Sequence, residues 1–557
     1  MIPIPRVASY SFVMHPRRSS ALATCLAVVV CGVACSRDNG VRSSVQTSSR
    51  QRQGEPAIGT AAPTASTATP SSSKPEERAG VQGQIEQLAK YALDELTALG
   101  TRQSLGEWKK NHASGTLELY GPRLSEQLNQ GWCARVRLET SLDADRSVRR
   151  DAYFYPPDPP TVLSLPVGAR PDELLDQCRL GFVWADVEDV DAARAERLAN
   201  ATRESLVSVL GTGQLNAKLS WWGAGYWRKT AMWNERGLSL ATATTNFRAW
   251  PTGGSGATTR VLVAAAGGAS KIRLEPFQRR TDPPEEYVEA FGVIASRINE
   301  AISIAGVGGT AEADARSALK LLSAASPPWH YPSDSDREFI LDAINEWFVS
   351  APSSPPTRRA AALFVADQLL GASGAGWGRN ENPPIRQQLE AHGATFNWAH
   401  LGDTWFYAHS WLKQSRQIDP DSRVGDLAFI TLMESGFETS GACSDQGGNG
   451  FRAVIREGGE FLRRKPDSVL SSDIHLLMAG AFGDIVRLAN GGGYEESVSA
   501  DYKSEAAASR TRAIEEYRLA FATPMPASAR AQEGWRNAWR LMAGLSPSRT
   551  YFYCVYD

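Results

Sequence analysis

The chain has 557 residues, of which 42% are hydrophobic and 22% are charged, and its formal net charge is −2. This composition is that of a globular protein long enough to form several domains. The balanced charge argues against a nucleic-acid-binding protein, because that function needs clustered Lys and Arg that displace counterions from phosphates.

The N-terminal 34 residues have the pattern of a secretory signal. Arg17 and Arg18 precede Ala21–Val33, an apolar run of 13 residues that is too short to span a bilayer comfortably. Met14 is an alternative start that would give a signal of conventional length. We therefore expect an exported protein from which residues 1–34 are removed.

The apolar run ends in the segment Gly32-Val33-Ala34-Cys35-Ser36. This segment resembles the lipobox of bacterial lipoproteins, in which small residues precede a cysteine that is acylated and becomes the new N-terminus. Gly32 departs from the family pattern, which usually has a larger apolar residue at that position. The resemblance implies that acyl chains on Cys35 anchor the protein in a lipid bilayer, and Ser36 implies the outer membrane, facing the periplasm or the cell surface. A plain cleaved signal with an incidental cysteine is the alternative.

Residues 35–79 predict a lipidated N-terminus followed by a disordered tether. From Ser36 to about Pro75 the chain is rich in Ser, Thr, Ala and Pro and contains no aromatic residue, so it cannot bury a core. As a flexible coil, about forty residues would hold a folded body roughly 35 Å from the membrane.

Residues 80–280 predict an α+β domain with a mostly antiparallel sheet. The clearest strand begins at Trp132, where Ala134, Val136 and Leu138 alternate with polar residues. The other expected elements are helices over 82–99 and 191–210 and strands over 151–155, 179–187, 215–233, 238–245 and 260–266. We expect strands 215–233 and 238–245 to form a hairpin.

From Asp282-Pro283-Pro284 onward almost every periodic segment is helical. We expect a helical connecting region over 281–395. Within it, the capping box Ser335-x-x-Glu338 opens one helix and Pro355-Pro356 opens the next.

Residues 396–557 predict an all-α domain of three helix pairs. The expected pairs are 397–417 with 422–435, 450–464 with 471–490, and 506–522 with 527–543. In the last pair, Ala513 and Tyr517 precede Ala531 and Trp535, the mixture of small and aromatic residues that crossing helices require. This part resembles tetratricopeptide-like helical hairpins, and an ordinary helical bundle is the alternative.

Four cysteines remain after the signal is removed and Cys35 takes lipid: Cys133, Cys178, Cys443 and Cys554. An even number in an exported chain predicts disulfide bonds. Of the three possible connectivities we favour Cys133–Cys178 and Cys443–Cys554, because each pair then lies within one expected domain. Zinc is a weaker alternative, since no C-x2-C spacing exists and no histidine sits beside a cysteine. We expect no metal and no cofactor.

The segment Met433-Glu434-Ser435-Gly436-Phe437 resembles the Glu-Ser-x-Phe signature of lytic transglycosylases, whose glutamate is the general acid/base on peptidoglycan. About fifteen residues later the family has a Gly-Leu-Met-Gln-like segment, where this chain reads Gly447-Gly448-Asn449-Gly450-Phe451. Glu434 is therefore a candidate catalytic residue. The other interpretation is a solvated residue in the last turn of a helix.

The histidines indicate core or surface residues and no site, whereas the aromatic residues give a further candidate. His392, His400 and His409 form the only histidine cluster, and on an unbroken helix His400 and His409 would lie on opposite sides, unable to share a metal. By strand alternation, Trp222 and Tyr226 share one face of a strand that is rich in large rings. That face is either covered by packing or an exposed ring platform for a sugar or a partner protein.

Together, these patterns predict a membrane-anchored envelope lipoprotein acting as a non-enzymatic scaffold for an envelope protein or glycan partner. The alternative is a peptidoglycan hydrolase that uses Glu434.

Overall fold

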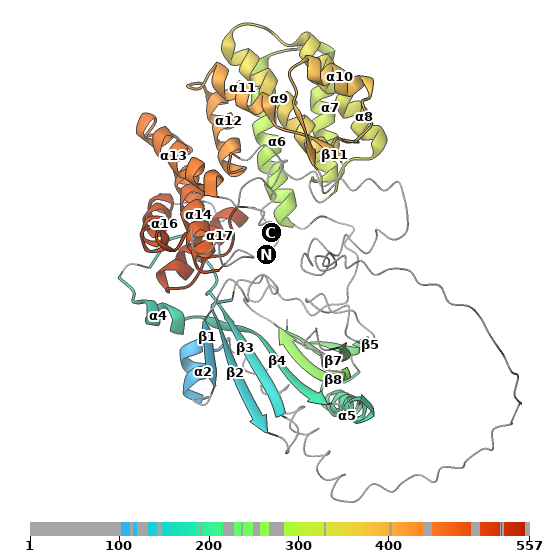
Figure 1. Cartoon of the computed structure of the whole chain (residues 1–557), viewed down its shortest axis with the longest axis vertical. Coiled ribbons are helices and arrows are strands. Elements are labelled where there is room, and N and C mark those ends of the chain that lie inside the picture. Colours follow the sequence, from blue (N-terminus) through green and yellow to red (C-terminus); the bar gives the residue numbers. More distant parts are fainter. Residues whose placement is uncertain are drawn as a thin grey trace, which may run out of the picture.

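The computed structural model describes most of the chain between Arg102 and Tyr551 (Figure 1). The described residues are 102–111, 115–119, 132–141, 147–166, 168–189, 192–212, 214–215, 228–235, 238–248, 257–266, 283, 285–327, 330–399, 404–437, 448–491, 502–523, 525 and 528–551. Among them, no helix is long and apolar enough to cross a lipid bilayer.

The first part of the chain forms an antiparallel eight-stranded sheet with the strand order β1-β2-β3-β4-β8-β7-β6-β5. The strands are β1 (Thr116–Leu119), β2 (Ala134–Ser141), β3 (Ser147–Tyr155), β4 (Arg179–Asp189), β5 (Gln214–Leu215), β6 (Arg228–Glu235), β7 (Leu238–Arg248) and β8 (Ala257–Ala266). Helix α5 (Ala192–Leu210) carries the chain from β4 to the far edge of the sheet. Antiparallel neighbours then bring it back until β8 pairs with β4. The predicted α+β architecture with an antiparallel sheet is confirmed.

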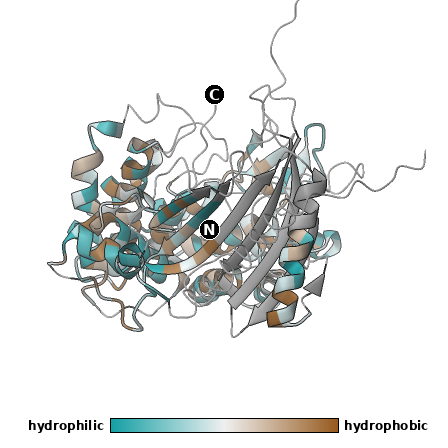
Figure 2. Cartoon of the chain, turned by 90° about the horizontal axis from the view of Figure 1, so that it is seen from below, coloured by the Kyte–Doolittle hydropathy of each residue, from teal (hydrophilic) through white to brown (hydrophobic). Residues whose placement is uncertain are grey.

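Side-chain alternation explains the packing of this sheet. Ala134 and Val136 are buried, whereas Arg135 and Arg137, which alternate with them, are half-buried on the other face. Figure 2 shows hydrophilic and hydrophobic residues alternating along the coloured strands. The strands expected over 151–155, 179–187, 238–245 and 260–266 and the helix over 191–210 correspond to β3, β4, β7, β8 and α5. The helix expected over 82–99 lies outside the described residues.

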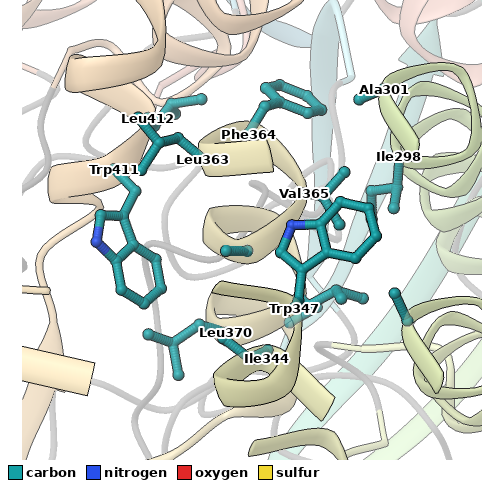
Figure 3. Close-up of a cluster of buried hydrophobic side chains, with 14 of the residues drawn as sticks. Ile298, Ala301, Ile344, Trp347, Leu363, Phe364, Val365, Leu370, Trp411 and Leu412 are labelled. Carbon is teal, nitrogen blue, oxygen red and sulfur yellow. The ribbon is translucent and has the colours of Figure 1, made fainter. Parts of the chain in front are cut away.

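A helical bundle follows the sheet. Its helices are α6 (Glu285–Ala305), α7 (Gly309–Ala325), α8 (Asp334–Ser350), α9 (Pro356–Ser373), α10 (Pro384–Ala391), α11 (Ser410–Ile418) and α12 (Arg423–Glu434). Helix α9 is central, because every residue from Ala360 to Ser373 is buried, and only Asp367, Gln368 and Ser373 among them carry polar side chains. In Figure 3, Trp347 and Trp411 lie on opposite sides of α9. The Trp347 indole donates a hydrogen bond of 3.0 Å to the Ala362 carbonyl and so satisfies its buried N–H.

The helix predicted over 397–417 is wrong in its first half. The structure has β10 (Phe396–Ala399) and β11 (Thr404–Tyr407) there, and α11 begins at Ser410. These strands form a three-stranded sheet with β9 (Gly376–Gly378), in the order β10-β11-β9. The strand pairing with β9, which is distant in sequence, overrides helical periodicity, and aromatic residues at every second position fit a pleated strand.

The capping box predicted at Ser335 is wrong by two residues. Ser333 is the N-cap of α8, and its side chain accepts a hydrogen bond from the Asp336 backbone N–H. The helix starts expected at Pro283-Pro284 and Pro355-Pro356 are confirmed within two residues.

The C-terminal helices stack against both the bundle and the large sheet. They are α13 (Gly448–Arg464), α14 (Ser471–Ala489), α16 (Ala506–Ala520) and α17 (Ala529–Met542), close to the expected ranges. One hydrophobic cluster contains Phe154 of β3 together with Tyr517 of α16 and Trp539 of α17. Helices α2 (Leu105–Asn111) and α4 (Pro171–Asp176) contribute to the same cluster. The sheet and the last helices therefore share a core, and Figure 1 shows the red helices next to β1–β4.

Candidate functional site

Glu434, the candidate catalytic residue, is the last residue of α12 and is buried. Its carboxylate receives two hydrogen bonds from the Arg297 guanidinium of α6, at 2.7 and 2.9 Å. Arg530 of α17 donates a third at 2.5 Å. The interpretation of Glu434 as a solvated residue is wrong, because α6 and α17 enclose this end of α12. We call Arg297, Glu434 and Arg530 the Glu434 cluster.

The electrostatics of the Glu434 cluster oppose proton donation. Burial would raise the pKa of Glu434, but the Arg297 and Arg530 charges outweigh burial and lower the pKa to about 2. A general acid needs a carboxyl that stays protonated near neutral pH. Asp473 of α14 interacts electrostatically with the same three groups, and burial raises its pKa. The geometry is that of one buried carboxylate paired with two arginines, which together join α6, α12 and α17.

Cys133 and Cys178 lie side by side in the core of the large sheet. Both are free thiols and fully buried. Burial raises the pKa of the Cys178 thiol well above its usual range, and a hydrogen bond with Cys133 adds to the effect. The structure thus brings together the first predicted cysteine pair, while their oxidation remains a prediction.

Several predicted residues lie outside the described residues. They are Cys35, Trp222, Tyr226, His400, Cys443 and Cys554.

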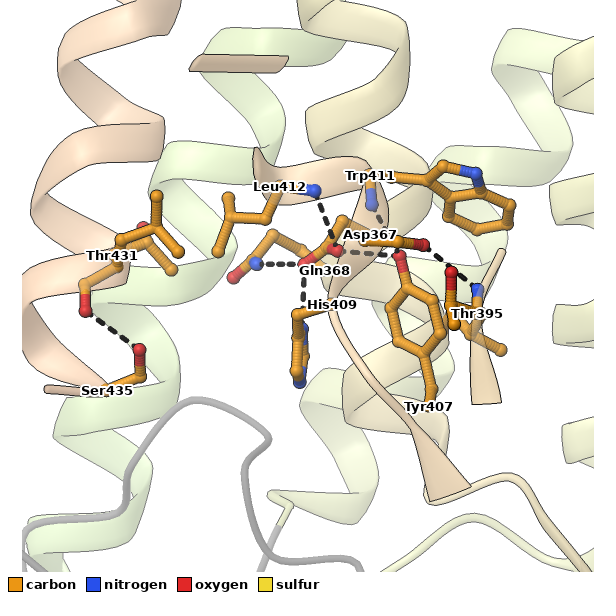
Figure 4. Close-up of polar contacts among 12 residues, drawn as sticks. Asp367, Gln368, Thr395, Tyr407, His409, Trp411, Leu412, Thr431 and Ser435 are labelled. Carbon is orange, nitrogen blue, oxygen red and sulfur yellow. Dashed lines mark hydrogen bonds and ion pairs between the residues drawn. The ribbon is translucent and has the colours of Figure 1, made fainter. Parts of the chain in front are cut away.

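A second buried polar cluster, which sequence reasoning missed, surrounds Asp367 in the middle of α9 (Figure 4). Asp367 Oδ1 accepts hydrogen bonds from the Tyr407 hydroxyl at 2.7 Å and the Leu412 backbone N–H at 3.0 Å. Its Oδ2 lies 2.9 Å from His409 Nδ1 and accepts a 2.9 Å bond from Gln368. We call Asp367, Gln368, Tyr407 and His409 the Asp367 cluster.

The Asp367 cluster fixes the start of α11. Leu412 N–H bonds to Asp367, and Trp411 N–H donates to the Tyr407 hydroxyl at 3.1 Å, so two amides of the first turn are satisfied. His409, at the N-cap, has φ +53°, a left-handed conformation that costs a non-glycine residue roughly 1–3 kcal/mol. Burial raises the pKa of Tyr407 well above its usual range, and the Asp367 charge adds to it. A lone acidic residue in the apolar run of α9 was the signal that could have revealed this cluster.

A carboxylate beside an imidazole also orients histidines in catalytic and metal sites. In the described part of the chain, however, no three His, Cys, Asp or Glu side chains meet as a metal site would require. His392 is at the end of α10 and His409 at the start of α11. His392 Nε2 lies 3.1 Å from Asn345 Oδ1 of α8, and His475 Nδ1 of α14 lies 2.6 Å from Glu516 Oε2 of α16. His392, His409 and His475 therefore each contact a side chain of another helix.

The small sheet β9–β10–β11 carries an aromatic face. Trp398 and Trp405 are cross-strand partners with ring centroids 5.4 Å apart, and both are half-buried at the outer end of the sheet. Trp377 and Phe396 continue the face inward and are buried. Trp398 and Trp405 lie on strands β10 and β11, whereas Trp411 lies on α11 and is fully buried.

Guanidinium groups cover parts of this aromatic face. Arg386 of α10 stands 4.6 Å from the Trp405 ring centroid and 5.5 Å from that of Phe396. Glu390 accepts a hydrogen bond from it at 2.9 Å. Arg379 is exposed and lies 5.8 Å from the Trp398 centroid. The outer end thus combines two half-buried indoles with an exposed cation, a surface suited to polar ligands with flat apolar faces.

Comparison with protein-family models, with curated proteins and with solved structures finds no match.

Proposed function

We propose that this chain is an exported envelope lipoprotein, anchored through acyl chains on Cys35 and acting as a non-enzymatic binding scaffold. The support for the anchor is the signal, the lipobox-like segment and the aromatic-free stretch 36–75 that would serve as a tether. Ser36 favours the outer membrane as its location.

Metabolic labelling tests the anchor. Cells expressing the chain are grown with a clickable fatty acid, and the purified protein is probed for label. Wild type is expected to carry label in the membrane fraction, and Cys35→Ala is expected to lose both the label and the membrane association. Label that persists in Cys35→Ala would overturn the anchor.

The observation that carries the binding role is the outer end of the small sheet. The half-buried rings of Trp398 and Trp405 offer apolar faces to the CH groups of a sugar ring, and Arg379 offers hydrogen-bond donors to its oxygens. A glycan of the cell envelope is the ligand class that this combination fits best. The tether would place the sheet within reach of such a glycan.

Soluble cell-wall fragments provide the test. Titration monitored by tryptophan fluorescence is expected to saturate for wild type and to weaken at least tenfold for Trp398→Ala. Phe339→Ala is the matched control, because Phe339 is an exposed aromatic residue on α8, 38% exposed and outside the sheet. Equal weakening by both variants, or no saturation in wild type, would overturn the glycan role.

We also propose that the C-terminal helix pairs are tetratricopeptide-like hairpins, in which α13 packs on α14 and α16 on α17. The small residues Ala513 and Ala531 are fully buried where such helices pack closely. The predicted Cys133–Cys178 and Cys443–Cys554 disulfides belong to the same proposal.

The hydrolase alternative makes a different prediction for cell-wall turnover. Since Glu434 is held as an ionised partner of two arginines, we expect wild type to release no soluble fragments from purified peptidoglycan. Turnover that is lost in Glu434→Gln and kept in Glu300→Gln would overturn the scaffold proposal.

A further inference from the structure

A tight turn holds Arg379 beside the two half-buried indoles of the small sheet. The turn covers residues 378–381 and begins at the last residue of β9. The Gly378 carbonyl accepts a hydrogen bond from the Glu381 N–H at 2.9 Å, and the Glu381 side chain accepts one from the Gly378 N–H, also at 2.9 Å. Because these two reciprocal bonds close the turn, they define the backbone position of Arg379.

The turn is also joined to the aromatic face. The Trp405 indole N–H donates a hydrogen bond of 3.4 Å to the Arg379 carbonyl, and the Arg379 guanidinium carbon lies 5.8 Å from the centroid of the Trp398 ring. Trp398 and Trp405 are themselves cross-strand partners. We call Arg379, Trp398 and Trp405 the outer site. One cation and two apolar rings therefore meet at one end of the sheet.

The other charged groups around the outer site already have partners. Arg386 donates hydrogen bonds to the Glu390 carboxylate at 2.9 Å and to the Glu381 carbonyl at 3.3 Å. The Glu381 carboxylate holds the Gly378 N–H, as described above. By contrast, in the part of the chain that the structure describes, no carboxylate pairs with the Arg379 guanidinium, which is exposed. Arg379 is therefore the charge at this site that an anionic ligand would neutralise.

A sugar ring that carries a carboxylate matches both parts of the outer site. Its CH groups would pack on an indole face, and its carboxylate would accept two parallel N–H bonds from the guanidinium. A neutral sugar would pack on the same indoles but would give Arg379 no anionic partner. The charge of the sugar therefore decides how much Arg379 contributes to binding.

We infer that the outer site prefers acidic sugars to neutral ones and that Arg379 is the residue that determines this preference. The inference rests on the proposed glycan-binding role and names the ligand class within it, a glycan whose rings carry free carboxylates. Because the ion pair forms at an exposed residue, the preference is about fivefold in affinity and falls as salt screens the charges.

Two disaccharides that differ in one acidic substituent provide the test. N-acetylglucosaminyl-N-acetylmuramic acid carries a lactyl carboxylate where chitobiose has a hydroxyl. Titrations of the full chain are followed by tryptophan fluorescence. Wild type is expected to bind the acidic disaccharide about fivefold more tightly at low salt and to lose this preference at high salt. Arg379→Gln is expected to bind both disaccharides as weakly as wild type binds chitobiose.

Arg359→Gln is the matched control. Arg359 is also exposed, but it lies in the first turn of α9, whereas β9 follows the last turn, roughly 20 Å away along the helix axis. This variant is expected to keep the preference of wild type. Circular dichroism of Arg379→Gln should equal that of wild type, because the bonds that close the turn come from Gly378 and Glu381.

The outcomes separate this inference from the proposed function. If cell-wall fragments saturate wild type but the acidic disaccharide binds no more tightly than chitobiose, the preference for acidic sugars is overturned and the glycan role stands. A preference that Arg379→Gln retains, or that Arg359→Gln loses equally, would overturn the assignment to Arg379. If neither the fragments nor the disaccharides saturate wild type, the glycan role itself is overturned, and the inference with it.

Discussion

Replacing Glu434 with Gln removes one negative charge from the Glu434 cluster and keeps the shape of the side chain. Arg297 and Arg530 would then face each other without the carboxylate that receives their hydrogen bonds. Breaking a buried ion pair by removing one partner costs about 3–5 kcal/mol, because the remaining charges stay buried.

The pKa of Glu434 gives a second, independent value for the free energy of unfolding that the ionised carboxylate contributes. Folding lowers it from 4.5 to about 2, and each unit corresponds to about 1.4 kcal/mol, so the ionised form contributes about 3 kcal/mol. Because the folded-state pKa is depressed, this contribution is present above pH 4.5 and is lost as the pH falls toward 2. Glu434→Gln should therefore destabilise the protein at pH 7 and flatten the acid limb of its stability curve.

Urea unfolding followed by circular dichroism measures both effects. Glu300→Gln is the matched control, because Glu300 pairs with Arg423 at 2.7 Å between α6 and α12, with both side chains more than one-third exposed. Exposed pairs contribute about 0–1 kcal/mol. If Glu434→Gln cost no more than Glu300→Gln, the reasoning from burial would be refuted.

Three further predictions concern the other buried groups. Burial raises the pKa of Asp484 from 3.8 to about 6, so stability should fall by about 3 kcal/mol as the pH rises from 4 to 6. Asp484→Asn should lose that dependence, and an unchanged pH profile by urea unfolding would contradict it. Tyr407→Phe removes one donor to Asp367 and should cost about 1–3 kcal/mol by the same assay, whereas a neutral effect would show that the hydroxyl is dispensable. In protein purified from the exported fraction, mass spectrometry should find the peptide that contains Cys133 linked by a disulfide to the peptide that contains Cys178. Reduction of this pair, which closes a loop of about 45 residues, should cost about 4 kcal/mol, and free thiols in that fraction would disprove the bond.

Local patterns predicted most of the secondary structure correctly. Period-two alternation at Ala134 and Val136 and amphipathic repeats in the C-terminal helices are properties of neighbouring residues, and they reappear in β2, α13, α14, α16 and α17. One failure occurs where distant segments decide the outcome. Residues 396–399 and 404–407 form strands, and β11 pairs with β9, which is distant in sequence. The N-cap of α8 is a local error, because Ser333 caps the helix through the Asp336 N–H only three residues away.

The same distinction between local patterns and contacts of distant segments applies to the candidate sites. The Glu-Ser-x-Phe segment was visible in the sequence, but α6 and α17, 137 and 96 residues away, decide the charge of Glu434. Asp367 and His409 are 42 residues apart, and no local period connects them.

By itself, the sequence determined most of the succession of strands and helices, together with the signal-like pattern at the N-terminus and the aromatic-free composition of residues 36–75, because each depends on residues close together in the chain. Only the tertiary structure decided that Glu434 is a buried ion-pair partner, that Cys133 meets Cys178 and that Asp484 of α14 accepts hydrogen bonds from the backbone of Thr550 and Tyr551. Burial and electrostatic neighbours are set by contacts between distant segments, and those contacts exist only in the folded chain.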